Sequence, residues 1–166
     1  MHRPYVRGSI AALAACCLVV ALAGCGHGDP DPGGGILDAL KTVQVAVPSD
    51  ATNVVANFAE PYWEPGCDGR KGTEGWSDVT VDISFSSDRP GQELIYAAQP
   101  PLAEAGWSAD GTRTSPLGPS QSWTRTLDDG TILHASLGPG SRDNGATISW
   151  FLYASAPPHG RRASGC

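Results

Sequence analysis

Two small groups of polar residues in the C-terminal third have types and spacings that catalysis uses. His134 and Ser136 share one face of an expected strand, where an imidazole could act as the base for a hydroxyl nucleophile. Asp128 and Asp129 are adjacent carboxylates. His134 has no evident orienting acid or strained turn beside it, and an Asp before Gly130 is what a hairpin turn requires. We therefore assign no catalytic residue and interpret both groups as ordinary strand and turn polarity.

An irregular stretch over residues 60–78 combines aromatic rings with carboxylates. Such groups together can form a platform for a sugar or a peptide, or a cluster of carboxylates for calcium. The same composition also fits a loop that packs on its own tryptophans and is tied down by Cys67. The sequence offers one candidate binding surface, drawn from this stretch and the last expected strand: Tyr62, Trp63, Glu64, Asp68, Trp76, Phe151 and Tyr153.

Metal and cofactor motifs are missing from the sequence. His27 and two aspartates lie in a glycine-rich segment, and a single histidine in coil offers no preorganised set of metal ligands. Residues 138–140 read Gly-Pro-Gly, but neither a helix start nor a lysine follows them, as a phosphate-binding loop would require. The chain has no HExxH, CxxC or Walker-type pattern and no EF-hand spacing. We expect no metal and no cofactor.

Cys25 lies two residues after an apolar run, residues 10–23, and this run follows Arg3 and Arg7. The run has 14 residues, which suits a secretion signal and falls short of the about 17–25 that a membrane-spanning helix needs. Residues 22–25, Leu-Ala-Gly-Cys, resemble the lipobox of bacterial lipoproteins. The resemblance implies removal of residues 1–24, acylation of the Cys25 thiol, and attachment to the extracytoplasmic face of the cell membrane. A second match ends at Cys16, but its apolar core would be shorter than a signal requires.

Two further cysteines remain after such processing, Cys67 and Cys166. Two thiols in an oxidising compartment usually pair, so we expect a disulfide between them; the alternative is two free thiols. The bond would close a loop of about 100 residues, for which the chain-entropy estimate is roughly 4–5 kcal/mol. It would tie the C-terminal tail, residues 157–166, to the domain.

Composition limits the partners. Without residues 1–24 the chain has 142 residues, with nine basic against 17 acidic side chains and hence a net charge of −8. An acidic surface lacks the cationic attraction that nucleic acids and anionic headgroups need, so we expect no nucleic-acid partner. Contact with the bilayer should come from the acyl chains on Cys25. The chain prefers arginine over lysine and contains 21 glycines and 14 prolines, a composition that, together with the lipobox-like segment, resembles that of small lipoproteins of actinobacteria.

Hydrophobic periodicity predicts a single α+β domain over residues 36–156, after a lipidated cysteine and flexible Gly/Pro linker at 25–35. We expect an antiparallel sheet of four to six strands, with one kinked helix packed on one face. A helix follows residues 87–90, with Asp88 as its cap, and Pro100 and Pro101 should break or kink it. Residues 138–145 should form a loop, and Asp-Gly at 129–130 a hairpin turn. The expected strands cover residues 43–47, 53–59, 79–86, 122–127, 131–137 and 146–156.

These observations favour a membrane-anchored, non-enzymatic binding or accessory module of the cell envelope, with an envelope protein or a cell-wall component as its partner. The alternatives are a small cell-wall or ester hydrolase without a recognisable motif, and a structural spacer. An enzyme predicts a deep pocket with convergent polar groups, whereas a binding module predicts an exposed aromatic patch. A spacer predicts neither feature.

Overall fold

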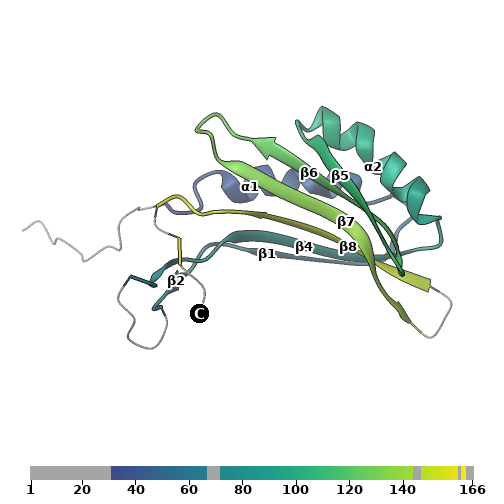
Figure 1. The fold of residues 1–166 in the computed structure, drawn as a ribbon, viewed down its shortest axis with the longest axis horizontal. Helices are drawn as coiled ribbons and strands as arrows, with labels where there is room; N and C mark the ends of the chain where they lie inside the picture. The colour runs from purple at the N-terminus through teal and green to yellow at the C-terminus, as the bar shows by residue number, and fades with distance from the viewer. Residues whose placement is uncertain (1–30, 67–71, 144–146, 161, 164–166) are drawn as a thin grey trace, which may run out of the picture.

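The computed structural model describes residues 31–66, 72–143, 147–160 and 162–163. Six antiparallel strands form its main sheet, in the order β1-β4-β8-β7-β6-β5 (Figure 1). The strands are β1 (Thr52–Ala59), β4 (Val79–Ser87), β5 (Ser108–Ser115), β6 (Gly118–Thr126), β7 (Ile132–Asp143) and β8 (Thr147–Ala156). A two-stranded sheet of β2 (Trp63–Glu64) and β3 (Gly75–Trp76) lies in the connection between β1 and β4.

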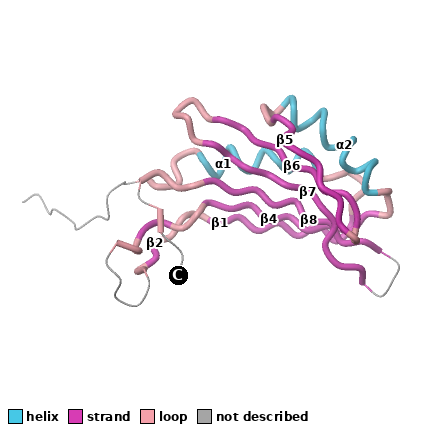
Figure 2. Tube along the Cα trace, viewed as in Figure 1, coloured by secondary structure: helices cyan, strands magenta, loops and turns pink. Residues whose placement is uncertain are grey.

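Helices cover one face of the main sheet and leave the other uncovered (Figure 2). They are α1 (Ile36–Lys41), the 3-10 helix η1 (Thr42–Ala46) and α2 (Gly91–Glu104). The core between helices and sheet is closed by large side chains that are almost fully buried, among them Trp123, Trp150, Phe85, Leu40, Leu94, Leu102, Leu133 and Leu152. The predicted α+β class, with an antiparallel sheet of at most six strands and helical packing on one face, is confirmed.

The two central strands follow directly from their alternation of apolar and polar residues. Along β4, side chains from Val79 to Ser87 alternate between buried and more exposed, and the apolar ones face the helices. β4 pairs with β8 so that Ile83 lies opposite Leu152 and Phe85 opposite Trp150. The predicted strands at 79–86 and 146–156 are therefore confirmed.

The β6–β7 hairpin has the predicted turn. Leu127 and Thr131 close it through an amide-to-carbonyl hydrogen bond of 2.9 Å, and Gly130 adopts a φ of +88° that glycine tolerates best. The Oδ1 atom of Asp129 accepts a hydrogen bond from the Thr131 amide at 2.8 Å. The loop predicted at 138–145 is wrong over 138–143, because β7 continues there along β8, with a bulge between Pro139 and Arg142.

Residues 43–47, predicted as a strand, are helical instead. They belong to η1, in which Val43 and Ala46, three residues apart, are buried while Val45 is 49 % exposed. The alternating run at 43–47 also has apolar residues three positions apart. A 3-10 helix has three residues per turn, so residues three apart lie on the same side, and here that side is the buried one. The strand predicted at 53–59 is confirmed as β1.

The α2 helix runs through Pro100 and Pro101 without a break. Its N-cap is Pro90 rather than the predicted Asp88, and its last turn keeps Leu102 fully buried in the core. At the C-terminus the Trp107 amide donates to the Leu102 carbonyl at 2.9 Å, beside Gly106 with a φ of +86°. This Schellman geometry ends the helix and returns Trp107 to the core, which offsets the bonds that the prolines remove.

The sequence predicts a flexible linker up to residue 35, but the structure of the domain already begins before residue 36. Residues 32–35 form a turn, and Gly33 is buried. The Pro32 carbonyl accepts a hydrogen bond of 2.8 Å from the amide of His159 in the C-terminal tail. Among the residues that the structure describes, no helix is both long and apolar enough to span a membrane.

Candidate functional site

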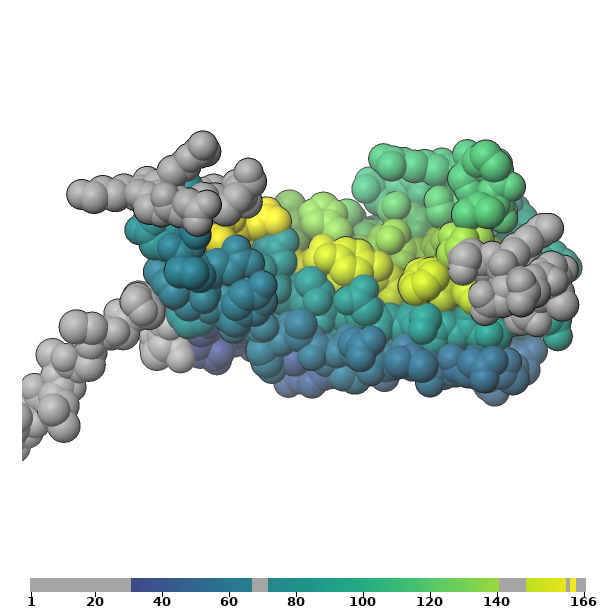
Figure 3. All heavy atoms as spheres, turned by 90° about the horizontal axis from the view of Figure 1, so that it is seen from below, coloured from purple at the N-terminus to yellow at the C-terminus, as the bar shows by residue number. Residues whose placement is uncertain are grey.

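The uncovered face of the main sheet, which we call the open face, is built from the outward side chains of its strands. Figure 3 views this face, with β8 in yellow between β4 in teal and β7 in green. The strand register sets three neighbouring rows across it. The rows are Thr80–Ser155–His134–Thr124, Asn57–Asp82–Tyr153–Ser136–Ser122 and Val55–Ser84–Phe151–Gly138–Ser120.

Two aromatic side chains stand among these small polar residues. Phe151 is 49 % exposed and Tyr153 is 40 % exposed, and both lie on β8 at the middle of the sheet. Tyr153 has Asp82 as its neighbour on one adjacent strand and Ser136 on the other. The sequence prediction that these two rings share a face opposite the core residues of β8 is confirmed by their exposure.

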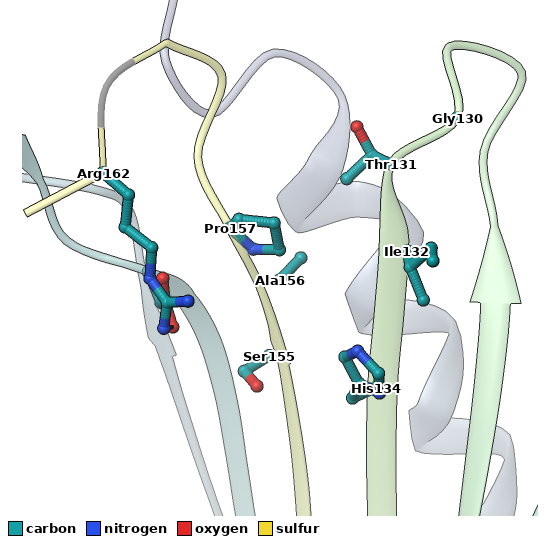
Figure 4. Close-up of a pocket in the computed structure, with 9 residues that line it drawn as sticks. Gly130, Thr131, Ile132, His134, Ser155, Ala156, Pro157 and Arg162 are labelled. Carbon is teal, nitrogen blue, oxygen red and sulfur yellow. Dashed lines mark hydrogen bonds and ion pairs between the residues drawn. The ribbon is translucent and has the colours of Figure 1, made fainter.

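A depression of about 410 Å³ opens beside the first row, at the end of β8 (Figure 4). It is lined by polar groups of several types, among them Asp78, Thr131, His134, Ser155 and Arg162. A second hollow of about 170 Å³ continues along the face and is lined by Asp110, Ser122, His134, Ser136, Tyr153 and Ser155. His134 and Ser155 line both hollows, so the two are neighbours on the open face, and we call them together the groove.

The charges in this groove are partly neutralised by an ion pair between Arg162 and Asp78. The guanidinium contacts Asp78 Oδ2, whereas Oδ1 of the same carboxylate is buried without a hydrogen-bond partner in the described part of the chain.

The groove does not assemble a hydrolytic triad. Ser155 lies directly across from His134 in the β7–β8 register, so it is a closer partner than the Ser136 considered from sequence. Within the described residues, however, no hydrogen bond joins the His134 ring to a hydroxyl or a carboxylate, and Asp78 is engaged by Arg162. A nucleophile and its base must be within hydrogen-bond reach and oriented by a third group.

The predicted binding residues of the 60–78 stretch lie at the β2–β3 hairpin and not on the open face. Trp63 and Trp76 are cross-strand partners in the β2–β3 sheet, and their rings meet edge to face, with centroids 5.4 Å apart and planes at 82°. Tyr62 is exposed, and its hydrogen bond to Glu64 raises the pKa of its phenol. The tryptophans thus pack on each other, which favours the structural interpretation of this stretch.

The structure therefore divides the predicted binding residues into two groups, one on the β2–β3 hairpin and one on the open face. Asp68 and the three cysteines predicted to be modified, Cys25, Cys67 and Cys166, lie outside the described residues. The C-terminal tail nevertheless lies against the β2–β3 hairpin. Arg162 forms an isolated parallel β-bridge with Trp76, and the amide of Ala163 donates a hydrogen bond of 3.0 Å to the Trp76 carbonyl.

Sequence reasoning missed most of the groove. The sequence suggests His134 only as a base and Asp78 only as one carboxylate of the 60–78 stretch, and it does not single out Ser155 or Arg162. The available signal was the alternation along the strands, which places His134 and Ser155 on outward positions. The described residues contain no cluster of three or more metal-ligating side chains. No protein-family model, curated protein or solved structure matches this chain.

Proposed function

We propose that this protein is a lipid-anchored, extracytoplasmic binding module whose open face binds a carbohydrate of the cell envelope. The observation that carries the proposal is the position of two half-exposed rings, Phe151 and Tyr153, at the centre of a sheet face on which most of the other side chains are small and polar.

The chemistry of the face matches a sugar. A pyranose presents a weakly apolar C–H face and a rim of hydroxyl groups, so it binds best where an aromatic ring lies beside hydrogen-bonding side chains. Tyr153 supplies the ring, while Asp82 and Ser136 supply an acceptor and a hydroxyl on either side of it. The adjoining groove adds the exposed imidazole of His134 and the hydroxyl of Ser155.

The shape of the groove favours binding over catalysis. It is shallow, it runs along the sheet, and within the described residues it lacks a hydrogen-bonded nucleophile and base. A lattice or chain of sugars can lie along such a face, whereas catalysis requires a site that orients the reacting groups and excludes water.

The proposed location rests on the lipobox-like segment. Cleavage before Cys25 would leave only five residues between the acylated cysteine and Asp31, where the described structure begins. A domain on so short a connection stays near the bilayer surface, within reach of envelope polymers.

The test is binding of the full-length protein to purified cell-wall polysaccharide and to soluble oligosaccharides cut from it. Tyr153→Ala should weaken binding by about tenfold or more, which is about 1.4 kcal/mol. Tyr96→Ala is the matched control, because Tyr96 is 62 % exposed on α2 and lies away from the open face. Equal binding by the wild type and Tyr153→Ala would overturn the proposed surface, provided that both variants melt like the wild type.

The same samples test the hydrolase alternative. Release of new reducing ends or of ester-derived acids by the wild-type protein, abolished in His134→Ala, would replace the binding proposal with an enzymatic one. Binding without product release supports the proposal.

A further inference from the structure

The β1 strand forms one edge of the main sheet and is exposed along its whole length. It pairs with β4 on one side, and on its other side the described structure places no strand. Its sequence from Thr52 to Ala59 contains no charged residue and no proline, and Val54, Val55 and Phe58 are about half exposed. Such an edge presents backbone donors and acceptors together with apolar side chains, so it is a template for pairing with another strand.

The opposite edge of the sheet is built differently. β5 carries Asp110 and Arg113, and its register with β6 is interrupted by a bulge between Ala109 and Gly111. Charges and bulges are the features by which natural sheets prevent edge pairing. A bulge also interrupts β1 near its start, between Thr52 and Val55, so the two edges differ in charge and not in the presence of a bulge. Residues 55–59 of β1 follow β4 in continuous register and carry no charge, so this part of the edge is open to pairing.

We propose that β1 pairs antiparallel with β1 of a second copy of this chain, about a twofold axis through Ala56. In this register Val55 faces Asn57 of the partner subunit on either side of the axis. Val54, in the bulged start of the strand, comes opposite Phe58 of the partner subunit. Each contact occurs twice, as an isologous interface requires.

The strand is complementary to itself in this register. Aromatic and β-branched residues in opposite positions form favourable cross-strand pairs, and an uncharged strand creates no like-charge pair. Phe58 is held from the helix side by Lys41, whose ammonium lies 5.7 Å from the ring centroid. That contact orients the ring before pairing, which lowers the ordering cost of association.

This register pairs only residues 53–59 of each strand, so the interface is small and the dimer should form in a concentration-dependent way rather than permanently. The twofold axis would be perpendicular to the sheet, since opposite residues of paired strands lie on the same face. The two open faces would then form one continuous surface. Only this last consequence rests on the proposed carbohydrate binding.

The first experiment measures the mass of the full-length protein by sedimentation in a density-matched detergent over a range of concentrations. The wild type should approach twice the mass of its own monomer, as determined by mass spectrometry of the same sample, at the highest concentrations. Ala56→Lys should remain monomeric, because it places two ammonium groups opposite each other at the twofold axis. Thr114→Lys, on the exposed edge strand β5, is the matched control and should dimerise like the wild type.

A second experiment tests the register. Residues that face themselves across an antiparallel pair have Cα atoms about 4.5–5.5 Å apart, within the range that a disulfide spans. Ala56→Cys should therefore form a covalent dimer on mild oxidation, above the background of the native cysteines, whereas Thr114→Cys should not. A monomeric wild type at every concentration, or an Ala56→Lys variant that dimerises like the wild type, would overturn the proposal. Either result would leave carbohydrate binding by the monomer intact.

Discussion

The ring of Phe151 occupies the space that a side chain at Gly140 would need. A Cβ atom built at Gly140 would overlap the ring, which lies across β7 from its position on β8. The glycine therefore lets the ring pack against the backbone of the neighbouring strand at a residue that has no side chain of its own. The position of the half-exposed ring is thus a property of two strands together and not of Phe151 alone.

This relationship predicts the effect of Gly140→Ala. The added methyl group should turn the Phe151 ring away from the sheet, at a cost of about 1 kcal/mol because an exposed ring can move. The loss in the free energy of binding to cell-wall carbohydrate should be larger than the loss in the free energy of unfolding. Gly111→Ala is the control, since a Cβ there meets nothing within 4 Å. Fluorine NMR of a fluorinated Phe151 would report the ring position, and an unchanged signal in Gly140→Ala would contradict the prediction.

The hydroxyl of Thr42 connects the helical layer to the sheet. It donates to the Ala39 carbonyl at 2.6 Å and accepts from Trp107 Nε1 at 2.9 Å and from Arg125 Nη1 at 3.2 Å. These three bonds use its full capacity of one donor and two lone pairs.

Thr42→Val, which keeps the shape and removes the hydroxyl, should destabilise the fold by about 1–3 kcal/mol because the buried Trp107 indole N–H loses its partner. Urea unfolding would measure this loss. Thr114→Val on the exposed strand β5 should change the free energy of unfolding by less than about 0.5 kcal/mol. Equal losses in the two variants would show that the hydroxyl of Thr42 is not needed.

How much of this arrangement the sequence predicts depends on burial. β4 and β8 are buried on one face only, so their alternation predicts both the strands and the outward direction of Phe151 and Tyr153. β5 escapes prediction because it is exposed on both faces and, unlike the equally exposed β1, contains no valine, isoleucine or aromatic residue that would indicate a strand. The Ser155–His134 neighbourhood also escapes, since it depends on a register that includes a bulge in β7.

Asp129 predicts a pH dependence of stability. Hydrogen bonds from the amide and the hydroxyl of Thr131, and then the nearby His159, lower the pKa of its carboxyl below the ordinary 3.8. A carboxyl with a lower pKa in the folded state adds stability above its unfolded pKa, and this contribution disappears as the pH falls through the folded value.

Asp129→Asn keeps the oxygen acceptor and removes the titration. The melting temperature of the wild type should therefore fall relative to that of Asp129→Asn as the pH drops below about 4. Melting curves from pH 7 to pH 2 would measure the difference. A difference between the two proteins that stays constant over this range would contradict the assignment.

The lipobox-like segment predicts membrane attachment through one thiol. Cys25→Ser removes the acceptor of the acyl chains, so the variant should no longer incorporate labelled fatty acid when the cells are grown with it. Cys16→Ser is the matched control and should incorporate the label like the wild type, because the signal is predicted to be cleaved after residue 24. Incorporation by Cys25→Ser equal to that of the wild type would contradict lipidation at this site.

Cys67 and Cys166 are predicted to form one disulfide, so replacing either cysteine should remove the whole bond. The approach of tail to hairpin, through the Arg162–Trp76 bridge and the amide that follows it, supports a bond between Cys67 and Cys166. Cys67→Ser and Cys166→Ser should then lower the free energy of unfolding equally, by about 2–4 kcal/mol. The double variant should lose no more than either single one, because each single variant already removes the whole bond. Thiol labelling of the unfolded, unreduced protein should find neither cysteine free, and additive losses or two labelled thiols would contradict the pairing.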